Sequence, residues 1–352
     1  MYNGIKFRRG GTAMARKTML GIYSAAHFWV DLSCAFLVFR TLLDTEELAL
    51  CLLLYNFCAF ALQMPFGLLA DRFDRNGLVA SLGCILVALA HLSPLPVLTA
   101  VAAGCGNALF HLGGGIDVLN TSQTKAWALG IFVSPGALGL FLGTLWGKGT
   151  AIPLWLGPVG LLVMTAAILL PYRKFFGSLR SGNAPCDTTP VNGYAPLLPL
   201  FLVVVLRSYM GMNQAFDWKS TGHWALTLTI ALVLGKAAGG ILMDRWGSRK
   251  TSAITLIGAA VLYLFCHVPI LGTLAVFLFN MTMPITLWAA AKVTPGCKGF
   301  AFGLLTFGLF IGYLPGWLGW PSILTSPVAY ALVALISLLL LWLPLGRDEM
   351  RC

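Results

Sequence analysis

Charged side chains are scarce in this sequence. Asp, Glu, Lys and Arg make up 10% of its 352 residues, whereas hydrophobic residues make up 58%. A soluble domain carries about 25% charged residues, so this chain has too few to cover an ordinary water-facing surface. Its apolar runs are each roughly 20 residues long, the length at which a helix crosses a bilayer. The sequence therefore predicts an all-α polytopic membrane protein.

Several other patterns are missing. The nine cysteines form no CxxC pair and lie mostly in apolar runs, which is typical of small buried side chains rather than of disulfides or zinc sites. The apolar runs are continuous, unlike the alternating segments of about ten residues in a membrane β-barrel. No phosphate loop, nucleophile elbow or metalloprotease motif is present. We expect no enzyme activity, no cofactor and no bound metal.

Acidic residues are fewer than basic ones, 12 against 23, which gives a formal net charge of +11. Nucleic-acid binding would explain such a charge, but the placement of the basic residues argues against it. With a cytoplasmic N-terminus and twelve spans, all but five lie on the inner side; these five are Arg40, Lys148, Lys219, Arg207 and Lys236. This asymmetry follows the positive-inside rule. It predicts a cell (inner) membrane protein with both termini cytoplasmic and no nucleic-acid partner.

One charged turn occurs twice in the chain. GLLADRFDRN at 67–76 returns as GGILMDRWGSRK at 239–250, and a shift of 173 positions places Asp71 on Asp244. Each copy lies between two long apolar runs. The repeat predicts two six-span halves related by an axis along the membrane normal.

The same shift pairs three glycines of the fifth span with three of the eleventh. The pairs are Gly130 with Gly303, Gly139 with Gly312, and Gly143 with Gly316. Small residues let helix backbones approach closely. We therefore expect both helices to pack at the interface between the halves.

The expected architecture is twelve transmembrane helices in two pseudo-symmetric six-helix bundles. A basic cytoplasmic N-terminus (1–17) precedes the N-terminal bundle (18–170). A cytoplasmic linker rich in Ser, Gly, Asn and Pro (171–194) joins it to the C-terminal bundle (195–344), and a short cytoplasmic C-terminus (345–352) follows.

The two turns share a pattern of Gly, Asp and Arg. The matching positions are Gly67, Asp71, Arg72 and Arg75 in the first copy and Gly240, Asp244, Arg245 and Arg249 in the second. Because of this pattern the chain resembles a major facilitator superfamily (MFS) transporter. The resemblance covers nearly the whole chain. The resemblance implies the two-bundle MFS fold and a cytoplasmic gate built from these residues. We add Asp117, near the cytoplasmic end of the fourth span, to this gate; capping a helix end is its alternative role.

The first 145 residues or so further resemble the fosmidomycin-resistance-like efflux branch of that superfamily. The resemblance is carried by His27 and Asp31, by Gln63 upstream of the first turn, and by GCGNALFH ending at His111. After this histidine the branch has Pro-Glu, whereas this chain has Leu112-Gly113. The resemblance implies efflux. Because Gly113 stands where the branch has Glu, no role for an acidic residue at this position is carried over.

Ionisable groups inside apolar spans cost a few kcal/mol each to insert, so they point to function. His27 and Asp31 are four residues apart on one helix face, and histidine titrates near neutral pH. We predict that they couple transport to protons, aided by His111. The alternative is a static pair that only fixes helix packing. Asn107 shares a face with His111 and is a predicted substrate contact or part of a proton relay.

The second half carries cations in its spans instead. Arg207 and Lys236 each lie in the middle of an apolar run. Two central cations suit an anionic substrate group. The alternative is that Asp31 or Asp117 neutralises one or both of them across the cavity.

Other polar or aromatic residues in the spans are further predicted substrate contacts. They are Asn56, Gln63, Asn213, Gln214, Asn280 and Trp288. Hydrogen bonds between helices are an equally common use of such side chains.

Together these patterns favour a monomeric secondary transporter in the lipid bilayer. It would move a small organic, anionic solute by alternating access, coupled to protons, with efflux favoured. One alternative is a uniporter or an uptake carrier without proton coupling. Another is a lipid-handling or receptor-like protein on the same scaffold.

Overall fold

The computed structural model describes residues 9–122, 125–149, 152–179 and 195–345, and every regular element within them is a helix. In the first half these are α1 (Arg9–Leu37) with the π-helical η1 (Val38–Leu42), α2 (Leu48–Asn56) with the π-helical η2 (Phe57–Ala61), α3 (Gln63–Phe73), α4 (Asn76–Ala90), α5 (Pro96–Ser122), α6 (Trp127–Val133), α7 (Pro135–Gly147) and α8 (Leu156–Leu179). In the second half they are α9 (Leu197–Asn213), α10 (Trp224–Trp246), α11 (Ser248–Tyr263), α12 (Pro269–Asn280), α13 (Thr282–Val293), α14 (Lys298–Trp317) and α15 (Pro327–Leu345).

Eight helical segments of the described chain are long and apolar enough to cross a membrane, and three shorter apolar helices, at 76–90, 156–172 and 197–213, accompany them. The chain is therefore a multi-pass membrane protein. Helix also extends into two segments that the sequence assigned to termini and linkers. α1 begins at Arg9, and α8 continues through Pro171, where we expected the linker to begin, and ends at Leu179. Membrane helices can continue through proline when neighbouring groups satisfy the freed backbone. The rest of the predicted N-terminus (1–8), linker (180–194) and C-terminus (346–352) lies outside the described residues.

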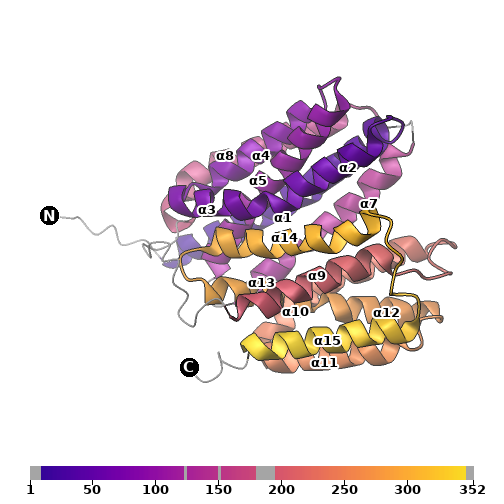
Figure 1. Cartoon of the computed structure of the whole chain (residues 1–352). Helices are drawn as coiled ribbons and strands as arrows, with labels where there is room; N and C mark the ends of the chain where they lie inside the picture. Colours follow the sequence, from indigo (N-terminus) through magenta and orange to yellow (C-terminus); the bar gives the residue numbers. More distant parts are fainter. Residues whose placement is uncertain (1–8, 123–124, 150–151, 180–194, 346–352) are drawn as a thin grey trace.

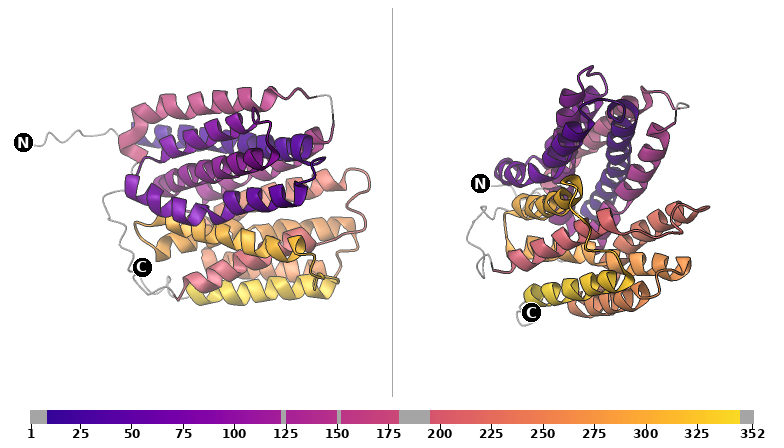
Figure 2. Two further views of the ribbon diagram at one scale, coloured as in Figure 1. Left: turned by 45° about the horizontal axis from the view of Figure 1, so that its top comes forward. Right: turned by 45° about the vertical axis from the view of Figure 1, so that its right-hand side comes forward.

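The helices run roughly alongside one another in two groups. Figure 1 shows α1 to α8 on one side and α9 to α15 on the other, and the two views of Figure 2 show the same division. The start of α1 and the end of α15 lie at the same end of the molecule. This placement is the one expected for an even number of crossings.

Two crossings join the groups, and the 173-residue repeat relates them. α3 packs on α14, where a Cβ added at Gly67 would lie 2.2 Å from the carbonyl oxygen of Gly299. α10 packs on α6, where a Cβ added at Gly240 would lie 2.5 Å from the carbonyl oxygen of Ala126. The shift that pairs Gly67 with Gly240 also pairs Ala126 with Gly299. The repeat is thus present in the structure as two equivalent close backbone contacts.

The paired glycines of the fifth and eleventh spans do not all lie at this interface. Gly130 and Gly303 do, on the backbones of α10 and α3. Both helices therefore pack at the interface as predicted, but the other glycines are used differently, and Gly316 has nothing within 4 Å of an added Cβ. Gly139 and Gly143 pack on the backbone of α1, and Gly312 packs on α9. They let a helix approach the first helix of its own half, a use that spacing alone cannot distinguish from contact between halves.

The described cysteines include both free thiols and a disulfide-bonded residue. Cys34, Cys51, Cys58, Cys84, Cys105 and Cys266 are free, and most are buried among apolar side chains as expected. Cys297, which immediately precedes α14, is disulfide-bonded, so the interpretation of every cysteine as a small apolar residue was wrong there.

Candidate functional site

Polar side chains from α1 and α5 form one cluster inside the first group of helices. Asp31 lies between two histidines: its Oδ2 is 3.2 Å from His27 Nε2, and its Oδ1 is 3.6 Å from His111 Nε2. Asn107 Nδ2 donates to Asp31 Oδ1 at 3.1 Å. The four residues predicted for proton coupling and relay are therefore in mutual contact.

The hydrogen bonds of the two histidine rings constrain their protons. His27 Nδ1 lies 2.7 Å from the carbonyl oxygen of Phe132, and His111 Nδ1 lies 2.9 Å from that of Asn107. A carbonyl oxygen only accepts, so both Nδ1 atoms donate. In the neutral rings, both Nε2 atoms then carry lone pairs. They face each other at 2.9 Å, a distance that suits a hydrogen bond only when one of them carries an additional proton.

A metal ion is the other cation that this geometry suits. The Nε2 atoms of His27 and His111 and a carboxylate oxygen of Asp31 lie within 4.8 Å of one another. Imidazole nitrogen with a carboxylate is a donor set that transition metals accept. A proton and a divalent metal therefore compete as explanations of the cluster, and an experiment separates them below.

Gly136, at the start of α7, covers the cluster. A Cβ at this position would lie 2.3 Å from both Asp31 Oδ2 and His27 Nε2. We did not select Gly136 from the sequence. The signal available was its place directly after Ser134-Pro135, where a helix is expected to be interrupted.

The interruption between α6 and α7 brings Lys236 close to the cluster. The last carbonyl groups of a helix have no partner within it, and here two of them accept side-chain bonds. The carbonyl of Phe132 accepts from His27, and that of Val133 accepts from Lys236 Nζ at 3.3 Å. Asp31 is near enough to act electrostatically on Lys236, although its ion pairs within the described residues are with the two histidines.

Arg207 on α9 is held from one side only. Its Nη2 donates to Thr282 Oγ1 at 2.8 Å and lies 3.5 Å from Thr286 Oγ1. Its Nε has no hydrogen-bond partner among the described residues. Neither Asp31 nor Asp117 forms an ion pair with it in this part of the chain.

A cavity of about 350 Å³ lies beside Arg207, between α7 of the first group and α9, α10, α11 and α12 of the second. It extends to Lys219 in the connection between α9 and α10. Of the predicted substrate contacts, Arg207, Gln214 and Asn280 line it, whereas Lys236, Asn107 and Asn213 are not among its lining residues.

The predicted amide contacts mostly bond to their own helices. The donors and acceptors are Asn56 to Leu52, Gln63 to Ala59, Asn213 to Tyr209 and Asn280 to Val276, each through the side-chain amide nitrogen and the carbonyl four residues earlier. Gln63 lies in the crossing of α3 and α14, where its carbonyl faces Gly303. It contributes packing there.

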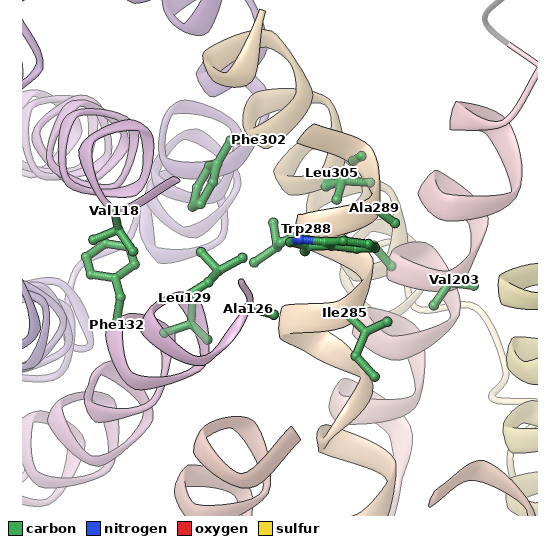
Figure 3. Close-up of a cluster of buried hydrophobic side chains, with 14 of the residues drawn as sticks. Val118, Ala126, Leu129, Phe132, Val203, Ile285, Trp288, Ala289, Phe302 and Leu305 are labelled. Carbon is green, nitrogen blue, oxygen red and sulfur yellow. The ribbon is translucent and has the colours of Figure 1, made fainter. Parts of the chain in front are cut away.

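Trp288 lies in an apolar cluster and not in the cavity. Figure 3 shows it on α13 beside Ala289, next to Leu305 and opposite Leu129 of α6. Its ring is almost fully buried. The cluster contains residues from both groups of helices, so it packs the two groups against each other.

The two copies of the charged turn bond across the groups. Asp71 accepts from two backbone N–H groups at the start of α14, at 2.7 and 2.9 Å. Asp244 accepts from two at the start of α6, at 2.7 and 3.0 Å. The donors are Gly299 and Phe300, and Ala126 and Trp127. A carboxylate at a helix N-terminus satisfies free N–H groups and complements the helix dipole.

The arginines of the turns lie in more exposed positions or against an aromatic ring. Arg72, Arg75 and Arg245 are exposed, and Arg249 lies over the ring of Trp342 at 5.3 Å from its centroid. Asp117, predicted with the gate, is buried within the first group. It accepts from Tyr23 Oη at 2.6 Å and from Asn76 Nδ2 at 2.9 Å, which joins α1, α4 and α5.

No protein-family model matches the chain, and no curated protein matches it in sequence. Its structure is similar to a crystal structure of a variant of the E. coli fucose:proton symporter FucP, with a TM-score of 0.65 and 12% identity over 95% of this chain and 99% of that one. It is also similar to FucP, an MFS transporter, in the outward conformation, with a TM-score of 0.62 and 13% identity over 92% and 98% of the two chains. The chain therefore has the fold of these MFS transporter structures. The resemblance to the fosmidomycin-resistance-like branch stays a prediction.

Proposed function

We propose that this protein is a proton-coupled secondary transporter of the MFS type that moves a small organic anion by alternating access. In this proposal twelve spans form two six-helix bundles in the inner membrane, with both termini cytoplasmic and one chain as the working unit. Efflux is the proposed direction.

One observation carries the coupling part of the proposal. The Nε2 atoms of His27 and His111 face each other at 2.9 Å while both Nδ1 atoms donate to carbonyl oxygens. Two facing lone pairs repel, and one added proton turns the contact into a charge-assisted hydrogen bond. Asp31 lies beside both rings as the counter-charge. The cluster is thus built to hold one proton more than its neutral rings carry.

The closed and open ends of the molecule support alternating access. Asp71 and Asp244 join the groups at the end where α9 begins, and the apolar cluster around Trp288 fills the space behind them. The cavity lies toward the end where α9 finishes, and Lys219 there is exposed. With cytoplasmic termini, this arrangement corresponds to an outward-facing state.

Asp31→Asn tests the coupling. Asparagine keeps the size of the side chain but removes the counter-charge, so the proton is lost. We expect the variant in proteoliposomes to lose solute transport driven by a pH gradient while it still exchanges labelled solute across the membrane. A solute is first found by thermal-shift screening of a metabolite and antibiotic library, because a ligand stabilises the state that it binds.

Other outcomes assign the alternative functions. Equal flux of the unmodified protein with and without a pH gradient would contradict proton coupling and support a uniporter or a carrier without protons. Flux that a chelator abolishes and Zn²⁺ or Ni²⁺ restores would assign the His27 and His111 cluster to a metal ion. Lipid-dependent stabilisation without flux of any solute would favour lipid handling.

A further inference from the structure

We propose that the cavity beside Arg207 binds a carboxylate with an apolar body, such as an arylalkyl or alkyl acid, rather than a polyol. This inference rests on the proposed transport function and names the solute class of the same site. Arg207 is its anchor, and the walls of α7, α9, α10 and α12 hold its apolar part.

The charges around the cavity all have one sign. Arg207 and Lys219 line it, and no Asp or Glu is among its lining residues. Arg207 lies near the middle of its helix, whereas Lys219 is exposed in the connection after α9. A cation at the entrance raises the local concentration of anions, and a deeper one can bind them.

Unpartnered hydrogen-bond donors support an anionic ligand. The two threonines of α13 hold Nη2 of Arg207 and fix the plane of the guanidinium, but Nε has no partner among the described residues. Gln214 also lines the cavity, and its Nε2 is buried without a partner in the same part of the chain. Buried donors are normally satisfied. A carboxylate would bring two acceptor oxygens to a cavity wall that has such donors.

The remaining walls are mainly apolar, with Thr144, Thr229 and Asn280 as their further polar residues. Phe141, Phe216, Phe279 and Leu228 line the cavity together with Tyr263. The amide nitrogen of Asn280 already donates to its own helix. A polyol needs hydrogen-bond partners around its whole surface, since hydroxyl groups buried without them cost free energy. Apolar walls around one cationic anchor instead match an amphipathic acid.

Binding by the purified full-length protein tests the proposal. Isothermal titration compares 4-phenylbutyrate with its neutral amide, with gluconate as a polar acid, and with 3-phenylpropylphosphonate as a different anionic head group. We expect 4-phenylbutyrate to bind at least about tenfold more tightly than the amide and than gluconate, because one charge-assisted pair and one apolar body are each lost. The phosphonate arm shows whether the head-group site prefers a planar carboxylate.

Variants then locate the binding. Arg207→Gln is expected to remove the preference for the acid over the amide, and Gln214→Leu to reduce it. Phe279→Ala should weaken both ligands alike. Arg40→Gln is the matched control, since Arg40 lies outside the cavity and donates to the carbonyl of Gly149. A thermal unfolding transition shows that each variant is folded. If Arg207→Gln does not fold, the preference for the acid is measured in Gln214→Leu instead.

Several results would overturn the proposal. These are equal binding of acid and amide, tighter binding of gluconate, or no saturable binding of either phenyl compound. A preference unchanged in Arg207→Gln and Gln214→Leu would also overturn it. The transport function is tested separately: if a neutral solute from the thermal-shift screen moves with a pH gradient, and Asp31→Asn abolishes this, only the solute class is wrong.

Discussion

At the scale of single residues, the sequence indicates which polar side chains lie together but not how their atoms are oriented. The sequence predicts the cluster of His27, Asp31 and His111 correctly as a group, because spacing on α1 and cost of burial both select these residues. It cannot predict that two Nε2 atoms face each other, since that depends on which carbonyl oxygens occupy Nδ1. Lys236 was grouped with Arg207 on charge alone, and only the three-dimensional structure separates it from the cavity.

His91, which follows α4, is a residue-scale test of stability against pH. Its Nδ1 donates to the carbonyl of Val87 at 2.9 Å, and its Nε2 is buried near Gly157 with no hydrogen-bond partner among the residues that the structure describes. Burial lowers the pKa of His91 below the ordinary value of 6.5. Protonation is therefore easier in the unfolded chain, so the stabilising effect is present above about pH 6.5 and is lost as the pH falls further.

We expect the melting temperature of the unmodified protein to fall as the pH is lowered from 8 to 5. The melting temperature of His91→Gln should fall less steeply over the same range. The measurement is thermal unfolding in detergent at a series of pH values. His223→Gln is the control, because His223 is exposed. An unchanged slope in His91→Gln would contradict the assignment.

At the scale of elements, the break between α6 and α7 was the main feature missed. The sequence predicts one helix over about 126–147, whereas the structure ends α6 at Val133 and begins α7 at Pro135. Proline interrupts helices, but many membrane helices tolerate it because neighbouring groups satisfy the freed backbone. Here those groups are the side chains of His27 and Lys236, which come from distant parts of the chain. A local sequence pattern around Pro135 therefore cannot predict these two hydrogen bonds.

Gly136→Ala tests how closely α7 must approach α1. The added methyl group would collide with Asp31 and His27, so either the cluster or the start of α7 must shift. Overpacking of this kind costs roughly 1–3 kcal/mol. We expect lower thermal stability and loss of transport driven by a pH gradient.

Gly21→Ala is the control for that substitution. It lies on α1 with nothing within 4 Å of the added carbon, and alanine favours helix over glycine by about 1 kcal/mol. We expect unchanged or slightly increased stability. Equal loss in both variants would show that helix α1 itself, and not the cluster, responds.

For the whole molecule, two equivalent contacts join the two groups of helices at one end. The repeat in the sequence predicts both turns and their cytoplasmic place, but not their partners, because Asp71 and Asp244 bond to backbone N–H groups that any sequence supplies. The turns are not equal. Asp71 is half-buried with Lys298 nearby, whereas Asp244 is exposed.

Asp71→Asn and Asp244→Asn test these contacts. Each removes a charged cap worth roughly 1 kcal/mol, so hydrogen exchange should become about fivefold faster at the amides that it protected. Those amides begin α14 for Asp71→Asn and α6 for Asp244→Asn. We expect the larger change in Asp71→Asn, because Asp71 is the more buried of the two. The sequence favours the same order, since the 173-residue shift places Ser248 where the first turn has Arg75. Equal exchange at both sites before and after substitution would contradict a role in closing this end.

The neighbouring carbonyl groups of Phe132 and Val133 have one more consequence. One binds α1 in the first group and the other binds α10 in the second, so a single peptide unit separates the hydrogen bonds to the two groups. Its torsion angles fix the direction of one carbonyl relative to the other. If the groups tilt relative to each other, as the proposed alternating access requires, the rotation at Val133 decides whether both hydrogen bonds survive or one must break. Because both acceptors are backbone carbonyl oxygens, substitutions of the Val133 side chain should leave the two hydrogen bonds largely intact.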